Sequence, residues 1–245
     1  MTERMGFYER VLRSLLDDGL VARDWRVLVV AGGELDRAAF AATGFTDVTV
    51  TNLSDDADER QDAEQLTYDD DAFDLAVISA GLHHCASPHR AVLELYRVAR
   101  RGLLALEARD SALMRLAQRA GVVDEYELTA VADNAFAAGG VRNTAVPNFV
   151  YRWTEREVEK TIASAHPERR HRFAFFRELE LPVSVLELGG KAKWRFAAAP
   201  LALVTKLFPK QANLFAFAVF RGELQPWMRD ESTLDVDEVR RRLGG

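Results

Sequence analysis

The sequence predicts an α/β protein built on a doubly wound, mostly parallel sheet. Two continuous apolar runs rich in β-branched residues, 25–31 (WRVLVVA) and 73–79 (FDLAVIS), have the pattern of strands buried on both faces. A segment with helical spacing follows each run, and Gly32 and Gly33 turn the chain after the first one. Strands and helices that alternate in this order require crossover connections, which place the strands parallel in one sheet.

The remaining elements continue this alternation. Asp36 suits the N-cap of the helix after the first strand, Pro88 suits the first turn of another, and Thr154 with Glu157 forms the pattern of a capping box. Gly102 is expected to end the helix that Pro88 begins. We therefore expect helices at 5–20, 36–43, 88–101, 111–120 and 154–165, and further strands at 47–51, 103–106, 172–181 and 214–220.

Three stretches depart from this pattern within what reads as a single domain over 1–245. Residues 122–153 show no long period. Residues 191–208 form a basic, apolar segment interrupted at Pro200, which suits an ordinary amphipathic helix. Its cations Lys191, Lys193 and Arg195 would alternatively meet a phosphate or a membrane surface. The charged residues 230–245 suit a peripheral tail.

Composition narrows the class of partner and compartment. The chain of 245 residues has a formal net charge of −6, whereas nucleic-acid binders normally carry a basic excess. A lone cysteine, Cys85, cannot form an intramolecular disulfide and fits a reducing compartment. The N-terminus lacks the apolar core of a secretory signal, and no apolar stretch is long enough to span a bilayer. We therefore expect a cytoplasmic protein.

Several short motifs recur in a characteristic order along the central part of the chain. They are DAEQL at 62–66, AFDL at 72–75, GLHH at 81–84, Pro88, and YRVARRG at 96–102. In this order and spacing the chain resembles the class I S-adenosylmethionine-dependent methyltransferases, especially those that methylate small molecules. The resemblance covers roughly residues 25–121 and, weakly, the last strand. It implies a seven-stranded Rossmann-like sheet in which 214–220 is antiparallel, and it implies S-adenosylmethionine across the carboxyl ends of the first strands.

The cofactor positions that the resemblance implies are partly altered. The family's Gly-x-Gly-x-Gly turn falls on Ala31, Gly32, Gly33, Glu34 and Leu35, so that only Gly33 keeps a family glycine. Val29 stands where the family has an acidic residue. Asn52 occupies the position of the acid that holds the ribose hydroxyls, and an amide can accept one hydrogen bond and donate another. The segment between Asn52 and Asp62 is shorter than in the family.

The adenine position matches the family, and three further cofactor contacts are expected after the strand 73–79. Asp62 and Ala63 correspond to the family's adenine contacts, a carboxylate for the exocyclic amine and a backbone N–H for the ring. Ser79, Ala80 and Gly81 end the strand 73–79, where reactive groups gather.

Candidate catalytic residues follow that strand. His83 and His84 would lie at the substrate mouth, where one of them, His84 by preference, can act as a general base because imidazole titrates near neutral pH. Glu107 ends the neighbouring strand and could orient a histidine. Each histidine could instead only pack or satisfy backbone groups. A zinc site formed with Cys85 and His89 is disfavoured, because the sequence lacks a second, well-spaced pair of ligands.

Residues 122–166 would cover the substrate. Arginines and amides beside aromatic residues suit a sugar or another polyhydroxylated acceptor, and a loop packed on the sheet is the alternative. The substrate contacts expected from this stretch are Asn143, Asn148, Tyr151 and Arg152, with Arg142 and Trp153 beside them.

The leading hypothesis is methyl transfer from S-adenosylmethionine to a small-molecule acceptor, with an oxygen nucleophile, for example on a sugar. The altered glycine turn, Asn52 and the short segment after it favour an alternative, a non-catalytic methyltransferase-like binding protein or partner subunit. A nicotinamide-dependent dehydrogenase is disfavoured, because G-x-G-x-x-G does not follow the first strand.

Overall fold

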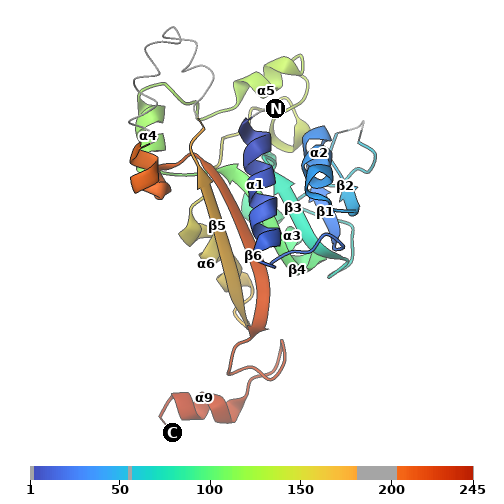
Figure 1. The fold of residues 1–245 in the computed structure, drawn as a ribbon, viewed down its shortest axis with the longest axis vertical. Helices are drawn as coiled ribbons and strands as arrows, with labels where there is room; N and C mark the ends of the chain where they lie inside the picture. Colours follow the sequence, from blue (N-terminus) through green and yellow to red (C-terminus); the bar gives the residue numbers. More distant parts are fainter. Residues whose placement is uncertain (1–2, 55–56, 181–202, 245) are drawn as a thin grey trace.

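One mixed sheet organises the chain, which a computed structural model describes over residues 3–54, 57–180 and 203–244 (Figure 1). In these residues the sheet has six strands in the order β2-β1-β3-β4-β6-β5. The strands are β1 (Arg26–Val30), β2 (Asp47–Val50), β3 (Phe73–Ser79), β4 (Ala99–Ala108), β5 (Arg169–Glu178) and β6 (Leu214–Leu224). Neighbours among β2, β1, β3 and β4 pair in parallel, and β6 is antiparallel to both β4 and β5. The expected fold class and the antiparallel last strand are therefore confirmed.

The described residues form one strand fewer than the seven that the family resemblance implies. The difference lies after β2, where the chain between Asn52 and Asp62 is short. A single parallel bridge, between Asn52 and Arg60, is the pairing found there. β2 is consequently an edge strand, and no further strand in the described residues shields the adjacent end of the sheet.

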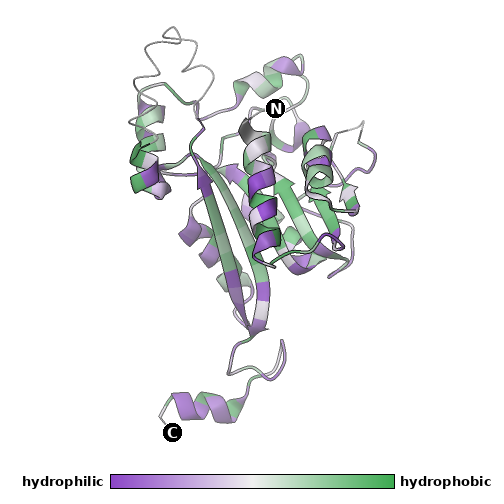
Figure 2. Cartoon of the chain, viewed as in Figure 1, coloured by the Kyte–Doolittle hydropathy of each residue, from purple (hydrophilic) through white to green (hydrophobic). Residues whose placement is uncertain are grey.

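Helices cover both faces of the sheet. The main ones are α1 (Glu3–Asp17), α2 (Glu34–Thr43), α3 (Pro88–Val98), α4 (Ala112–Arg119), α5 (Leu128–Asp133), α6 (Glu155–Ala165) and α9 (Val236–Arg242). Short 3₁₀ turns lie at η1 (Leu82–His84), η2 (Val141–Asn143) and η3 (Pro209–Gln211). Apolar side chains of α1 and α2 pack on one face of the sheet, and those of α3 and α6 pack on the other. Figure 2 shows hydrophobic strands inside these layers and a mostly hydrophilic α9 outside them.

Successive residues of the central strands supply the two cores. Leu28 and Val30 of β1 belong to the core under α3 and α6, whereas Val27 and Val29 belong to the core under α1 and α2. All four are fully buried, which explains the continuous apolar run in the sequence. Because the Val29 side chain points into this core, it does not take over the role of the acidic residue that the family has at this position.

Three sequence expectations about helix ends are wrong. α2 begins at Glu34, so Asp36 lies in its first turn and Gly33 is the N-cap. The helix that begins at Pro88 ends at Val98, and Gly102 lies inside β4, where a Cβ would come within 2.5 Å of the Val219 carbonyl oxygen. Glycine is therefore needed there for the close approach of β6. Thr154 does cap α6, but the Glu157 carboxylate accepts a hydrogen bond from Tyr151 instead of completing a capping box.

The two peripheral stretches differ in how much of them is described. Most of 191–208, including Lys191, Lys193 and Arg195, lies outside the described residues; positions 203–207 are helical. The segment 230–244 contains α9, which has no buried residue and extends away from the sheet (Figure 1). Among the described residues no helix is both long and apolar enough to cross a membrane.

Candidate functional site

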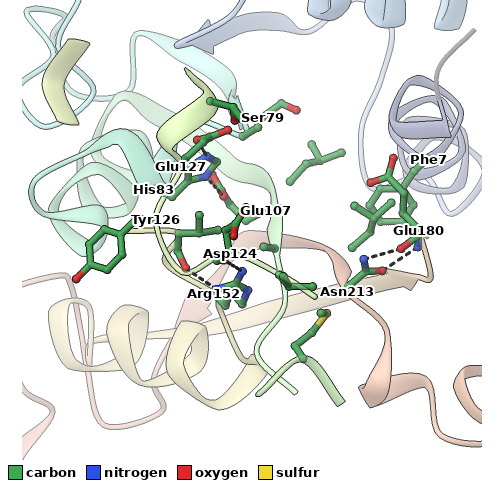
Figure 3. A pocket seen from close by; sticks show the side chains of 18 of the residues that line it. Phe7, Ser79, His83, Glu107, Asp124, Tyr126, Glu127, Arg152, Glu180 and Asn213 are labelled. Atoms are coloured by element: carbon green, nitrogen blue, oxygen red, sulfur yellow. Dashed lines mark hydrogen bonds and ion pairs between the residues drawn. The ribbon is translucent and has the colours of Figure 1, made fainter. Parts of the chain in front are cut away.

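Two adjoining cavities open at the carboxyl ends of the parallel strands. The larger has a volume of about 650 Å³ and reaches from α1 and α2 across β3 and β4 to the segment 123–152 (Figure 3). The smaller, of about 230 Å³, lies between the turn after β1, the segment 52–64 and the segment 139–143. Ala80, directly after β3, lines both. An elongated ligand that passes Ala80 can therefore occupy both cavities.

Most of the expected cofactor residues gather around these cavities. Ala31, Asn52, Asp62, Ala63 and Gly81 line the smaller one. Ser79 lines the larger one, together with Ala80. Gly32 and Gly33 line neither. A Cβ on Gly32 would come within 2.7 Å of Val29 and 2.8 Å of Val50, so this glycine allows the turn to pack on the sheet.

The cavities are bordered by two alanines with left-handed backbone. Ala31 directly follows β1 with φ 54°, and Ala80 directly follows β3 with φ 52°. Such a conformation costs an L-residue about 1–2 kcal/mol and is concentrated at functional sites. The Ala31 methyl group also explains why residue 81 is a glycine, because a Cβ at position 81 would lie only 2.8 Å from it. The altered glycine turn thus keeps the backbone of a tight turn despite the substitution at its first position.

Asn52 uses its side chain to hold this turn. Its Nδ2 donates to the Gly32 carbonyl oxygen at 2.9 Å, and its Oδ1 accepts from the Leu53 N–H at 2.7 Å and the Ser54 N–H at 3.3 Å. These are the contacts of a residue that begins a turn. Asn52 borders the smaller cavity, as expected, but its polar atoms are already engaged.

Asp62 is bound by the segment that covers the sheet. Its Oδ2 lies 2.6 Å from Arg142 Nη2, and its Oδ1 accepts from the Glu64 N–H at 2.9 Å. Arg142 has left-handed backbone, as has Asn143 beside it, and both line the smaller cavity. The pair connects the cover to the position expected to contact adenine.

A cluster of two histidines and two glutamates lies beside Ala80. His83 Nδ1 is 2.7 Å from Glu107 Oε2, and the other Glu107 oxygen accepts from the Leu82 N–H at 2.7 Å. On the opposite side, Glu127 Oε2 lies 3.4 Å from His83 Nε2 and 3.5 Å from His84 Nε2. His83, Glu107 and Glu127 line the larger cavity, whereas His84 lines the smaller one. The expected catalytic residues are thus brought together, with Glu107 paired to His83 rather than to His84.

The cluster gives its two histidines different protonation states. Burial lowers the pKa of His83, but the Glu107 and Glu127 carboxylates outweigh it and raise that pKa to about 10. Burial and the neighbouring His83 cation together lower the pKa of His84 below the ordinary 6.5. The hydrogen bond from His83 helps to lower the pKa of Glu127 to about 2. At neutral pH, His83 is therefore an imidazolium and His84 a neutral imidazole, which is able to accept a proton.

The ligand atoms of His83, His84 and Glu127 lie within 4.8 Å of one another, a separation that a metal ion could bridge. Glu127 already uses the same carboxylate oxygen for its contacts with both imidazoles. Cys85 and His89 lie outside this group: Cys85 contacts the Gly81 carbonyl oxygen at 3.5 Å, and His89 lies 3.4 Å from Glu157.

The four expected substrate residues have different locations. Arg152 lines the larger cavity, where its guanidinium donates to the carbonyl oxygens of Asp124 and Val150. Asn143 lines the smaller cavity instead. Asn148 is fully buried and holds Glu127 at 3.2 Å, so it acts on the cluster rather than on a ligand. Tyr151 lines neither cavity and bonds to Glu157.

The sequence did not single out Glu127, because residues 122–153 have no periodicity to indicate which side chains face the sheet. Trp153 explains how this segment is positioned. Its backbone N–H donates to the Ala108 carbonyl oxygen at 2.9 Å, and its backbone carbonyl oxygen accepts from the Asp110 N–H at 3.0 Å. The fully buried Trp153 thus fixes the cover to the end of β4, beside Glu107.

Comparisons with known proteins agree with this architecture. Residues 31–106 match the family model described as "Methyltransferase domain". No curated protein matches the sequence. Among solved structures, YcgJ from Bacillus subtilis is similar with a TM-score of 0.53 and 13% identity, covering 87% of this chain and 99% of that one. A chain of the Haloferax volcanii complex between the Trm112 methyltransferase activator and a putative methyltransferase is similar with a TM-score of 0.50 and 14% identity, covering 86% and 93%.

The part of the chain that the family model covers, residues 31–106, is therefore similar to a methyltransferase domain. At these identities the solved structures show the fold alone. One of them, the [4+2]-cyclase SpnF, is similar with a TM-score of 0.51 and 16% identity, covering 89% of this chain and 82% of that one. The acceptor must therefore be argued from the site rather than from the fold.

Proposed function

We propose that the protein transfers the methyl group of S-adenosylmethionine to an oxygen of a small, polyhydroxylated acceptor such as a sugar. The observation that supports this most directly is the histidine–glutamate cluster beside Ala80, where the two cavities adjoin. A hydroxyl nucleophile must lose its proton as the methyl group moves, and the cluster contains one neutral imidazole.

In this proposal the smaller cavity holds the adenosine part of the cofactor. Asp62 accepts from the exocyclic amine, the Ala63 backbone faces the ring, and Asn52 lies at the ribose. Ala31, Gly32 and Gly33 provide the turn, and Ser79, Ala80 and Gly81 border the passage into the larger cavity. The bound cofactor supplies a methyl group that is already activated by its positive sulfur.

The catalytic assignment follows from the charges. His84 lines the smaller cavity, but its Nε2 lies 3.5 Å from Glu127 on the wall of the larger one. Because His84 is neutral and 32% exposed, it can take the hydroxyl proton where the two cavities adjoin. His83 is buried and cationic between Glu107 and Glu127, so it holds the carboxylates in place and donates hydrogen bonds rather than accepting a proton. Glu127 accepts from His84 once that residue is protonated, which stabilises the resulting charge.

The acceptor would occupy the larger cavity under the cover 122–166. Its wall there carries hydrogen-bonding groups of Tyr126, Glu127 and Arg152 (Figure 3). The apolar residues Val123 and Val150 line the same cavity. Polar groups that are fixed by main-chain contacts, as Arg152 is, suit the recognition of several hydroxyl groups at once.

The test combines calorimetry with single-turnover kinetics. Wild-type protein should bind S-adenosylmethionine and S-adenosylhomocysteine, and a panel of sugars and other polyols should reveal acceptors through the release of S-adenosylhomocysteine. His84→Asn should lower the methyl-transfer rate roughly 10²–10⁴-fold without changing cofactor affinity. His89→Asn, a histidine that also lies near a glutamate but lines neither cavity, is the matched control. Near-wild-type rates for both His83→Asn and His84→Asn would exclude general-base catalysis by this pair.

A non-catalytic binding protein is the second candidate, and the Arg142–Asp62 ion pair favours it. The pair occupies the carboxylate that the first proposal assigns to adenine. For a non-catalytic protein in which this ion pair persists, we expect that the wild type binds neither S-adenosylmethionine nor S-adenosylhomocysteine. Arg142→Gln removes the ion pair and frees Asp62, but it should not produce methyl transfer. Binding of S-adenosylhomocysteine by the wild type rules against this candidate.

A further inference from the structure

One arginine on the wall of the larger cavity carries a charge that no carboxylate balances. Arg152 is half-buried, and within the described part of the chain it makes no ion pair. Every other lysine or arginine of the described residues is either exposed or, like Arg109 and Arg177, paired with a carboxylate. The unpaired, partly desolvated cation therefore lies in the cavity that the acceptor is proposed to occupy.

Two main-chain carbonyl oxygens hold the guanidinium of Arg152 without neutralising it. Nη1 donates to the Val150 oxygen at 3.1 Å, and Nη2 donates to the Asp124 oxygen at 2.9 Å (Figure 3). A guanidinium has more N–H donors than these two bonds use, and they form a planar fork. Because the fork is already fixed in one orientation, a ligand that binds to it loses little side-chain entropy.

The surroundings of Arg152 destabilise its charged form. Burial lowers the pKa of Arg152, and the negative charges of Asp110 and Glu125 oppose this effect only from a distance. Asp110 pairs with Arg115 at 2.6 Å, and Glu125 is exposed. An arginine keeps its charge at neutral pH, so a bound anion would restore the missing balance.

The rest of the cavity wall favours a single negative charge on the ligand. Among the described residues that line this cavity, Arg152 is the only lysine or arginine, and the His83 cation is enclosed by Glu107 and Glu127. These glutamates repel an anionic group from the end of the cavity where the proton is removed. A phosphate dianion would exceed the charge of one arginine, whereas a carboxylate, with one charge and two oxygens, matches its fork.

We propose that the acceptor is a polyhydroxylated carboxylic acid, such as a uronic acid, and that Arg152 binds its carboxylate. This assignment rests on the proposed function and names the acceptor class. A hydroxyl group at the other end of the molecule lies at His84. Its oxygen forms the bond to the methyl carbon as the carbon–sulfur bond breaks, its proton passes to His84, and S-adenosylhomocysteine leaves. The carboxylate stays unchanged, and a neutral sugar is disfavoured because it leaves the Arg152 charge unpaired.

The test compares sugars that differ only in the charged group. The methyl glycosides of glucuronic, galacturonic and mannuronic acid are each compared with their neutral parent and with its phosphorylated counterpart, by calorimetry on wild type saturated with S-adenosylhomocysteine. We expect at least one of the acids to bind at least tenfold more tightly than both counterparts, a difference of about 1.4 kcal/mol. With S-adenosylmethionine instead, the product should be a methyl ether that resists base. A methyl ester, which base hydrolyses, would overturn the proposal.

Variants of Arg152 separate binding of the carboxylate from support of the cover. We expect Arg152→Gln to weaken binding of the preferred acid at least tenfold and binding of its neutral parent less than about threefold. Arg152→Lys keeps the charge without the fork, so its affinity for the acid should lie between those of wild type and R152Q; this variant also serves if R152Q does not fold. Arg115→Gln is the matched control, because it removes an arginine that lines neither cavity, and it should leave all affinities unchanged.

The possible results separate this assignment from the proposed function. Equal binding of acids and neutral parents by the wild type, tighter binding of the phosphorylated sugars, or a parallel loss of acid and neutral parent in R152Q would overturn the carboxylate assignment. Failure of every acid to bind to wild type loaded with S-adenosylhomocysteine would also overturn it, while the proposed function would stand. A wild type that does not bind S-adenosylhomocysteine would overturn the proposed function, and this assignment with it.

Discussion

Replacing Glu107 by glutamine tests the charge arrangement on which the proposed catalysis depends. The Glu107 side chain is 0% exposed and accepts two short hydrogen bonds, from the Leu82 N–H and from the His83 ring. Glutamine can keep the first through its amide oxygen but cannot compensate the imidazolium. Hydrogen bonds to charged groups contribute about 1.5–3 kcal/mol, so we expect E107Q to lower the free energy of unfolding at pH 7 by that amount. Glu107→Ala, which leaves His83 facing Glu127 alone, should lose about 3–5 kcal/mol.

The pH dependence of this loss is the sharper observation. The folded-state pKa of His83 is raised from 6.5 to about 10. Its stabilising effect is therefore complete below pH 6.5 and is lost as the pH rises through 10. Since E107Q removes much of this effect, the difference in stability between wild type and mutant should shrink between pH 6.5 and 10.

Urea denaturation followed by circular dichroism at pH 6, 7.5 and 9 measures both quantities. Glu155→Gln is the matched control, because the partly buried Glu155 pairs at 2.6 Å with an arginine, Arg109, instead of a histidine. Its loss of stability should be independent of pH across the three conditions. An E107Q protein as stable as wild type, or one whose loss is the same at pH 6 and pH 9, would refute the imidazolium assignment.

Three further substitutions examine the cofactor side of the site. Asp62→Ala should weaken S-adenosylhomocysteine binding at least tenfold, about 1.4 kcal/mol, and unchanged affinity in a folded mutant would exclude the adenine contact. Asn52→Asp exchanges the donor to the Gly32 carbonyl oxygen for a charged oxygen; a drop of about 1 kcal/mol in unfolding free energy without a gain in affinity is expected, and tighter binding would instead favour a ribose role. Ala31→Gly should relieve the left-handed backbone and raise the melting temperature by a few degrees, and a lower value would contradict the strain argument.

The layers of the fold could be predicted because strands buried on both faces appear in the sequence as continuous apolar runs. The runs that became β1 and β3 are apolar throughout, and Pro88 and Thr154 mark helix starts by local chemistry. Glycine was less informative. Gly102 resembles a helix stop in sequence, but its function is to let β6 approach β4, a contact with residues more than a hundred positions away.

The site was predictable in part for a similar reason. Residues at strand ends, such as Ser79 and Glu107, are placed by the sheet and could be located from the motifs. Glu127 and Arg142 come from an irregular segment whose path is set by tertiary contacts, so no periodicity indicates their orientation. Asp36 was visible in the sequence as a capping residue, but its burial depends on how α1 packs over α2, which is not encoded locally.

The two edge strands of the sheet also affect how copies of the chain interact. In the described part of the chain the two edges are β2, four residues long, and β5, ten residues long. An exposed edge invites a second molecule to add a strand and so to aggregate. β2 offers few backbone groups for such pairing, and Asp47 at its start is exposed. β5 is long enough to be a template, but its first half is rich in arginine, with Arg170 and Arg172 exposed. Two copies that paired through the same edge would bring charges of like sign close together, which opposes association of β2 with β2 or of β5 with β5.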